Sequence, residues 1–329
     1  MGTVAFVFPG QGSQYVGMGK ALAEASPAAA AVFAEADAAL GEPLSTLAWS
    51  GQSADLDLTV NAQPALLATS IAYLRALDER LAAGGTGPLA PAFYAGHSMG
   101  QYSAMVAAGV ISVTDGVRLV RERGRQMQAS GQGRDGAMAA IIGLDDERLP
   151  DVRAAGSAAG IFTIANLNSP GQVVVSGERA AVDAAVAAAR GLGARRAVTL
   201  PVSVAAHSPL MSEAAAGMRA ALAAVPFHDP VAPLLANADG SPLTTGEACR
   251  AELVEHLTTG VDWVAAVRAM SAAGVSVFVE IGPGRVLTGL GKRIALDAAS
   301  VALDEPDAPG RLAVPAIQPD PGSAAAPTR

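Results

Sequence analysis

Cysteine is almost absent from this chain of 329 residues, in which Cys249 is the only one. A single thiol excludes an intramolecular disulfide and argues against a cysteine-based metal site. Aromatic side chains are also scarce, at 4%, whereas 51% of the residues are hydrophobic. The core must therefore be built mainly from Ala, Val, Leu and Ile. The length predicts one large domain with a sizeable insertion, or two domains.

Basic charge and long apolar runs are lacking as well. Lys and Arg number 22 against 30 Asp and Glu, which gives a formal net charge of -8. A surface that follows nucleic-acid phosphates needs an excess of basic side chains, so we expect no nucleic-acid partner. No apolar run is long enough to cross a bilayer, and no basic residue precedes Lys20, as a signal peptide would require. We therefore expect a cytoplasmic protein without a membrane partner.

Strand-like and helix-like segments alternate in the first part of the chain, as in an α/β protein. Strands are predicted at residues 4–8 and 91–95, and helices at residues 15–40, 63–81 and 101–108. Between residues 136 and 202 the order becomes βαββαβ, which is that of a ferredoxin-like unit and predicts an inserted subdomain that closes its own small sheet. A buried strand at 275–281 and a helix to about residue 294 follow.

The predicted boundaries follow from these changes of pattern. Beyond Leu303, six prolines among Ala and Gly predict a disordered tail. We expect a catalytic domain made of residues 1–132 and 203–303, an insert of residues 133–202, and a tail of residues 304–329.

Ser98 stands between two glycines in the stretch AGHSMGQY. The pattern Gly96-x-Ser98-x-Gly100 is that of a nucleophile elbow, in which a sharp strand-to-helix turn exposes the serine hydroxyl. The N-terminus of the following helix favours negative charge at the same place. Because GxSxG also arises by chance in chains rich in Gly and Ala, the prediction depends on the position of Ser98 between a strand and a helix.

A serine hydroxyl needs a base to become nucleophilic, and the chain has four histidines. His207 follows the strand-like PVSVAA, at the kind of strand end where open α/β sheets build their sites, so we predict it as the base; a capping role is the alternative. His97 projects away from its neighbour Ser98 and is expected to orient the turn. His256 lies in a helical segment and is expected on the surface or hydrogen-bonded in the core. His228 is expected in a loop.

An acyl group attacked by serine also needs donors for its oxyanion. The main-chain N–H of Met99 is the first donor expected for an elbow, and the loop at residues 9–14 is the best source of the second. A dinucleotide-binding loop is the alternative for Gly10-x-Gly12, but its third glycine would fall at Tyr15.

Arg123 lies between Leu119 and Met127 on one stripe of a predicted helix. A guanidinium on an apolar stripe either extends to water or meets an anion. If Arg123 faces Ser98 instead of solvent, it can bind a carboxylate through two hydrogen bonds.

Seven motifs together resemble the malonyl-CoA:acyl carrier protein transacylases of fatty-acid and polyketide synthesis. They are FVFPGQGSQ, AGHSMGQYSA, RGRQMQ, GAMAAIIGLD, NLNSPGQVVVSG, LPVSVAAHSPLM and EIGPGRVLTGLGKRI, and the resemblance covers residues 4–304. It implies an α/β-hydrolase-like core with a ferredoxin-like insert. It also implies Ser98 as nucleophile, His207 as base, and the main-chain N–H groups of Gln11 and Met99 as the oxyanion hole.

The same resemblance implies that Arg123 binds the free carboxylate of the acyl group, and that Met127 and Asn168 line its pocket. The residues before the base read VAAH, which is neither the HAFH usual for malonyl-selective polyketide enzymes nor the YASH of methylmalonyl ones. The small Ala206 leaves room for a substituent and the bulky Met99 opposes it. Malonyl is the expected acyl group, and a substituted malonyl or another acyl unit is the alternative.

Two further positions depart from the family pattern. Gln101 stands where the family usually has Glu, and Asp262 stands where an amide side chain is common. The resemblance implies that a main-chain carbonyl near Asp262 orients the base, so this substitution need not affect catalysis.

The resemblance implies a ping-pong reaction in which malonyl-CoA acylates the serine and the phosphopantetheine thiol of an acyl carrier protein removes the acyl group. CoA is then a substrate, phosphopantetheine arrives on the partner, and neither a permanently bound cofactor nor a metal is expected. We expect a monomer, with Arg195-Arg196 and Lys292-Arg293 as candidate contacts for the acidic carrier. The alternatives are an acyl hydrolase, which would not require Arg123, and a catalytically silent docking module.

Overall fold

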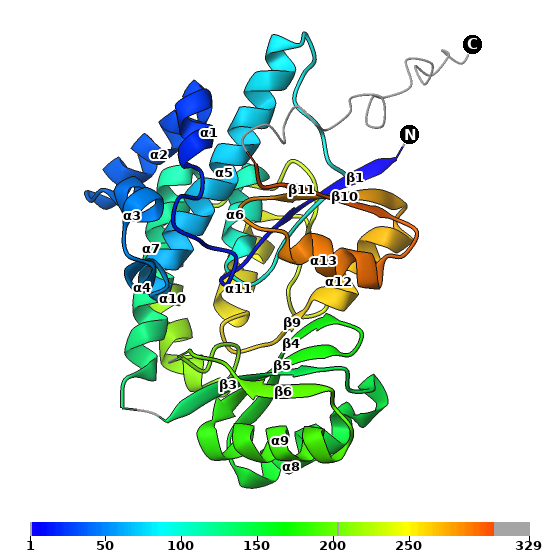
Figure 1. Ribbon diagram of the computed structural model, residues 1–329. Helices are drawn as coiled ribbons and strands as arrows, with labels where there is room; N and C mark the ends of the chain where they lie inside the picture. The colour runs from blue at the N-terminus through cyan, green and yellow to red at the C-terminus, as the bar shows by residue number, and fades with distance from the viewer. Residues whose placement is uncertain (1, 134, 203, 306–329) are drawn as a thin grey trace.

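The computed structural model describes residues 2–133, 135–202 and 204–305. Its larger part is built on a six-stranded sheet in the order β11-β10-β1-β2-β7-β8 (Figure 1). The strands are β1 (Thr3–Phe8), β2 (Phe93–Gly96), β7 (Leu234–Leu235), β8 (Pro242–Leu243), β10 (Val275–Ile281) and β11 (Ala299–Leu303). Neighbouring strands are parallel except at the β7–β8 pair.

Both faces of this sheet are covered, and the residues of β1 show how. Val4, Phe6 and Phe8 belong to one hydrophobic core, whereas Ala5 and Val7 belong to another. Successive side chains of a strand point to opposite faces, so β1 is buried on both sides, as in other parallel sheets. The larger part of the structure, built on this six-stranded sheet, is therefore an α/β arrangement with three layers.

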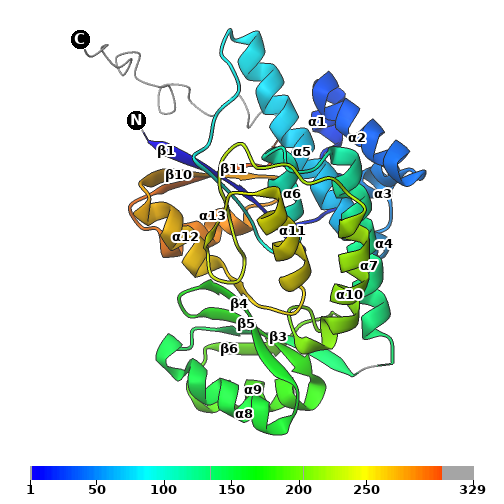
Figure 2. The ribbon, with the colours of Figure 1, turned by 180° about the vertical axis from the view of Figure 1, so that it is seen from behind.

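Helices form the two outer layers. The larger core contains residues of α1 (Lys20–Ala25), α2 (Pro27–Leu40), α3 (Leu44–Ser50), α4 (Ser53–Leu56), α5 (Thr59–Ala83), α6 (Gly100–Ala107), α7 (Val113–Gly131), α10 (Ser212–Ala223) and α11 (Gly246–Glu255). The other contains residues of α12 (Trp263–Ala272) and α13 (Val286–Ile294). Both views show α7 beside α10 (Figures 1 and 2).

The single helix expected at residues 15–40 is instead two helices. Ser26 ends α1 and begins α2, where its Oγ accepts a hydrogen bond of 3.1 Å from the Ala29 N–H. Pro27 occupies the first position of α2, where a missing N–H has no cost. The break brings Ser26 Oγ within hydrogen-bonding distance of Glu79 on α5.

The segment predicted as an insert has the expected order of elements. They are β3 (Gly136–Ile142), α8 (Leu149–Ala159), β4 (Phe162–Ser169), β5 (Gln172–Glu178), α9 (Arg179–Gly191) and β6 (Arg196–Thr199). Helices α8 and α9 cover the face of this sheet that is turned away from the larger part of the structure (Figure 1).

The prediction that this segment closes its own sheet is wrong. The order of the smaller sheet is β6-β3-β5-β4-β9. Strand β9 (Val261–Asp262) comes from outside the segment and pairs in parallel with β4, with Asn166 opposite Val261. A strand of two residues shows no periodicity, so the sequence could not reveal this link between the two parts.

The C-terminal strand β11 was also not expected, and it forms an edge of the large sheet beside β10. The next two residues belong to the predicted tail and are held by contacts. The Tyr73 hydroxyl donates to the Asp304 carbonyl at 2.7 Å, and Arg285 pairs with both Asp304 and Glu305. The rest of the predicted tail lies outside the described residues. Across the three described ranges, no helix is long and apolar enough to cross a membrane.

Candidate active site

Ser98 lies in the tight turn between β2 and α6. Its φ is 53°, a left-handed conformation that is strained for a residue with a side chain. A Cβ on Gly96 would lie 2.0 Å from the Gly100 carbonyl carbon, and a Cβ on Gly100 would lie 2.2 Å from the Phe8 carbonyl oxygen. Both glycines of the motif are therefore required for the turn to close against β1, and Ser98 stays partly exposed.

Asn237 holds this turn from the end of β7, and sequence reasoning missed it. Its Oδ1 accepts from the Ser98 N–H at 2.9 Å, and its Nδ2 donates to the Gly96 carbonyl at 3.1 Å. The Asn237 N–H in turn donates to Glu252 Oε1 at 2.6 Å. A polar residue directly after an inner strand was the only available signal, and β7 is too short to predict.

His207 lies against Ser98, with Nε2 2.8 Å from the serine Oγ. Its Nδ1 lies 2.7 Å from the His256 carbonyl and 3.1 Å from the Thr259 carbonyl. Because carbonyl oxygens only accept, Nδ1 carries the proton and Nε2 is left to accept from the serine hydroxyl. Burial, and then the charge of Arg123, lower the pKa of His207 to about 4. The imidazole is therefore neutral at pH 7, as a base must be.

His256 is neither on the surface nor hydrogen-bonded through its ring, so both expectations for it are wrong. It is fully buried, and its ring nitrogens have no partner within the described residues. Its ring centroid lies 6.2 Å from that of His207 and 6.0 Å from that of Tyr102. Burial holds the pKa of His256 well below its usual value. A neutral ring therefore packs against the candidate base.

Arg123 faces Ser98 and not solvent. It is 2% exposed, and its Nη2 donates to the serine Oγ at 3.1 Å. Its Nη1 donates to Gln63 Oε1 at 2.8 Å. In the described part of the chain no carboxylate pairs with Arg123. Burial lowers its pKa, yet a guanidinium stays charged, so the site holds a buried cation beside the serine that pairs with no anion of the described residues.

The two expected oxyanion donors come from different segments of the fold. Met99 directly precedes α6, and Gln11 follows β1. A Cβ on Gly10 would lie 2.6 Å from the His97 carbonyl oxygen, so the loop after β1 lies directly against the elbow. Neither Met99 nor Gln11 donates its main-chain N–H to a main-chain carbonyl of the described residues. Neither N–H group is thus occupied by a main-chain carbonyl of the described residues, which leaves it able to donate to an oxyanion.

The other predicted site residues surround this centre. Met127 Sδ lies 3.6 Å from Gln63 Nε2, next to the guanidinium of Arg123. Asn168 Oδ1 lies 2.9 Å from His97 Nε2, so Asn168 holds the neighbour of the serine. Ala206 is partly buried and packs on the larger core. That these residues line an acyl pocket stays a prediction.

Gln101 and Asp262 have structural partners. The Gln101 side chain accepts from the Gly96 N–H at 3.0 Å and donates to the Leu235 carbonyl at 2.9 Å, which ties β2 to β7. Asp262 caps α12 by accepting from the Ala265 N–H at 2.8 Å. The base is oriented by the carbonyls of His256 and Thr259, so Asp262 is not required for that task.

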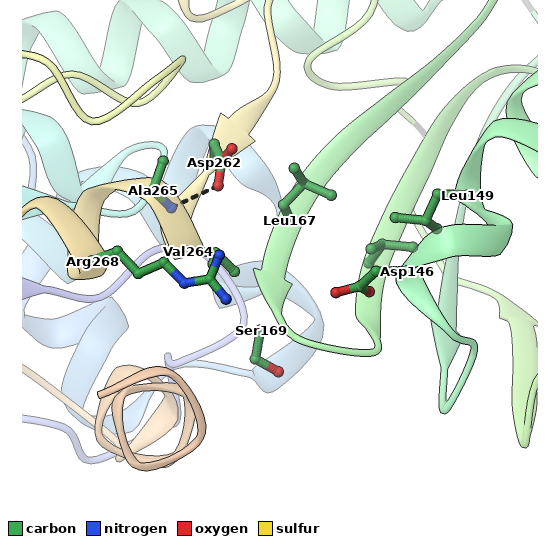
Figure 3. Close-up of a pocket in the computed structure, with 9 residues that line it drawn as sticks. Asp146, Leu149, Leu167, Ser169, Asp262, Val264, Ala265 and Arg268 are labelled. Atoms are coloured by element: carbon green, nitrogen blue, oxygen red, sulfur yellow. Dashed lines mark hydrogen bonds between the residues drawn. The ribbon is translucent and has the colours of Figure 1, made fainter. Parts of the chain in front are cut away.

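A cavity of about 220 Å³ lies between the smaller sheet and α12 (Figure 3). Its lining includes Ser169, Asp262 and Arg268, but not Ser98, His207 or Arg123. The Ser169 hydroxyl has no partner among the described residues, and no histidine lines the cavity. It therefore lacks the pairing of nucleophile and base found at Ser98.

Comparison with known proteins identifies the family of the chain. The model of the family described as "Acyl transferase domain" matches residues 5–322. The chain belongs to this acyl transferase family. It is 46% identical over 304 residues to the malonyl CoA-acyl carrier protein transacylase of Escherichia coli K12, covering 92% of this chain and 96% of the relative. The Bacillus subtilis 168 protein of the same name is 42% identical over 308 residues, and the match covers 93% of this chain and 95% of the relative.

Solved structures of this acyl transferase family are equally similar. The acyl-carrier-protein-S-malonyltransferase of Bartonella henselae gives a TM-score of 0.90 at 44% identity, with 96% of this chain and 99% of that chain covered. A malonyl-transacylase in complex with a type II PKS acyl-carrier protein gives a TM-score of 0.87 at 42% identity. The match covers 93% of this chain and 97% of that chain.

Proposed function

We propose that this acyl transferase moves a malonyl group from CoA to the phosphopantetheine thiol of an acyl carrier protein through an acyl-Ser98 intermediate. The observation that carries the proposal is the buried guanidinium of Arg123, which is hydrogen-bonded to Ser98 Oγ and lacks a carboxylate partner in the described chain. Malonyl-CoA offers a carboxylate one methylene away from its thioester carbon. Relatives named for malonyl transfer support this choice.

In the first half-reaction the malonyl carboxylate pairs with Arg123, which places the thioester carbonyl at Ser98. Oγ attacks that carbon while its proton passes to His207 Nε2. The main-chain N–H groups of Gln11 and Met99 stabilise the oxyanion. The tetrahedral intermediate then expels the CoA sulfur, which takes the proton from His207, and malonyl-Ser98 remains.

In the second half-reaction the phosphopantetheine thiol of the carrier gives its proton to His207 Nε2 and attacks the ester carbon. The same donors stabilise the second oxyanion, and Ser98 Oγ leaves with the proton from His207. The products are the malonyl thioester of the carrier and the free enzyme. CoA and phosphopantetheine are substrate groups here, and the proposed steps need no resident cofactor.

The finer architecture and the partner surface belong to the same proposal. We interpret the main domain as an α/β-hydrolase-like core and residues 133–202 as a ferredoxin-like insert that takes β9 as an added strand.

Four exposed basic side chains can contact an acidic carrier protein: Arg195, Arg196, Lys292 and Arg293. Arg293 Nη1 donates to Gln172 Oε1 at 2.9 Å, so it joins α13 to the smaller sheet. We propose that the enzyme acts as a monomer.

Incubation with malonyl-CoA, with and without a phosphopantetheinylated carrier protein, tests the function. We expect malonyl-carrier to accumulate and free malonate to form slowly. Rapid malonate release without malonyl-carrier would identify an acyl hydrolase, and the absence of any acyl-enzyme would identify a silent docking module. Competition among malonyl-, methylmalonyl- and acetyl-CoA for the acyl-enzyme determines the acyl group.

A further inference from the structure

A line of side chains joins the guanidinium of Arg123 to the loop that carries the Gln11 N–H. Arg123 Nη1 donates to Gln63 Oε1 at 2.8 Å, and Gln63 Nε2 donates to Thr59 Oγ1 at 2.8 Å. Thr59 Oγ1 donates to Gln11 Oε1 at 2.8 Å. The line thus runs from the acyl-binding cation to the oxyanion loop through the first turns of α5.

The chemistry of these groups fixes the direction of every bond. Arg123 can only donate, so the Gln63 atom that it meets must be the oxygen. The Gln63 amide nitrogen is then the group that faces Thr59, and the threonine oxygen accepts from it. The Thr59 hydroxyl proton is therefore left to donate to Gln11. A hydrogen-bonded network in which every group has its partner is rigid, so fixing the first group of the line restricts the position of the last.

The first turn of α5 and the segment before it contact both α7, which carries Arg123, and the loop after β1, which carries Gln11. A Cβ on Gly124, next to Arg123 on α7, would lie 2.6 Å from the Val60 Cα and 2.8 Å from the Thr59 carbonyl oxygen. The two helices therefore touch through their backbones. The loop after β1 has a second link to the segment before α5, because Gln14 Nε2 donates to Asp57 Oδ1 at 2.8 Å.

We propose that Thr59 is a positioning residue that couples carboxylate binding at Arg123 to the placement of the Gln11 N–H. Thr59 touches neither the serine nor the acyl group, and it acts through Gln63 and Gln11. A carboxylate that binds Arg123 fixes the guanidinium in place, and the line then holds the oxyanion loop at the elbow. The enzyme then favours malonyl over acetyl through the oxyanion as well as through binding. This inference rests on the proposed function.

Thr59→Val tests the coupling because it removes the hydroxyl and keeps the volume. Single-turnover acylation of Ser98 is measured with malonyl-CoA and acetyl-CoA. We expect malonyl acylation to fall about 10-fold or more at saturation with little change in half-saturation, and acetyl acylation to change less than 3-fold. Thr59→Ser keeps the hydroxyl and restores the malonyl rate. Equal losses for both acyl groups, or no loss in Thr59→Val, would overturn the coupling.

Gln11→Ala breaks the same line from its exposed end and keeps the main-chain N–H, so it tests the proposal if Thr59→Val does not fold. We expect the same loss of the malonyl-to-acetyl ratio, and an unchanged ratio contradicts the coupling. Failure of the proposed function gives a different result, because the wild-type protein itself would then form no malonyl-Ser98, or would release the malonyl group only as free malonate and transfer none to the carrier.

Discussion

Arg123 Nη2 and Ser98 Oγ are joined by a hydrogen bond of 3.1 Å, although Ser98 lies in the turn before α6, Arg123 lies on α7, and the two are 25 positions apart. The same serine oxygen lies 2.8 Å from His207 Nε2. The candidate nucleophile is thus flanked by a neutral base and by a buried cation. A base alone would activate the serine toward any ester or thioester, whereas the cation beside it favours an acyl group that carries its own carboxylate.

Replacing Arg123 tests this selectivity. Hydrogen bonds to charged groups contribute roughly 1.5–3 kcal/mol each, so Arg123→Ala should lower kcat/KM for malonyl-CoA by about 10-fold to 100-fold or more. Acetyl-CoA has no carboxylate, and its transfer should persist or rise. Arg125→Ala is the matched control, because Arg125 lies on the same helix but is exposed and pairs with Glu122. Undiminished preference for malonyl-CoA in Arg123→Ala would refute the role.

The pH dependence of acylation tests the protonation state of His207. Its pKa is lowered from 6.5 to about 4 by burial and by the charge of Arg123, and only the neutral form can accept the serine proton. Above this pKa the base is neutral, so kcat/KM should stay constant as the pH falls from 7 to about 5 and decrease only below that. A profile that is half-maximal near pH 6.5 would contradict the buried, neutral base.

Arg123→Leu provides an internal check on the cause of that shift. Removing the guanidinium removes the repulsion of a protonated His207, which is the second cause of the lowered pKa. With acetyl-CoA as substrate, the acid limb of kcat/KM should therefore move to higher pH than in the wild-type enzyme. An acid limb that stays in place would show that burial alone lowers the pKa.

Asn237 should be needed for both the fold and the reaction. Asn237→Ala leaves the Ser98 N–H and the Gly96 carbonyl without partners in the elbow. Buried polar groups that lose their partners cost about 1–3 kcal/mol each, so with two such groups the free energy of unfolding should fall by roughly 2–6 kcal/mol. Denaturant unfolding measures that loss. The control is Asn61→Ala, which removes a side chain that donates to the Asp55 carbonyl and accepts from Arg121 outside the elbow. Equal stability of Asn237→Ala and wild type would show that the turn at Ser98 keeps its conformation without the Asn237 side chain.

The sequence revealed those parts of the site that local patterns encode. Ser98 carries its own glycine motif and could be predicted from it. The apolar stripe of Arg123 left open whether its guanidinium meets water or an anion, and the family resemblance supplied the expected role. His207 could be chosen because it follows a strand-like segment. In each case the informative residues lie within a few positions of one another.

The remaining parts depend on contacts between distant segments. Asn237 reaches Ser98 across 139 positions from a strand of two residues, and β9 joins the smaller sheet from another strand of the same length. Such short strands form because their neighbours pair with them, so their own residues carry no signal. The line through Thr59 and Gln63 is equally hidden, because it needs α5, α7 and the loop after β1 to meet.

Intact-mass measurement of the protein after exposure to malonyl-CoA is the most direct test of malonyl transfer through Ser98. We expect a malonyl adduct on the wild-type chain, no adduct on Ser98→Ala, and transfer of the adduct to a phosphopantetheinylated carrier protein added afterwards. An adduct that persists in Ser98→Ala, or that is released only as free malonate in the presence of the carrier, would contradict transfer through Ser98.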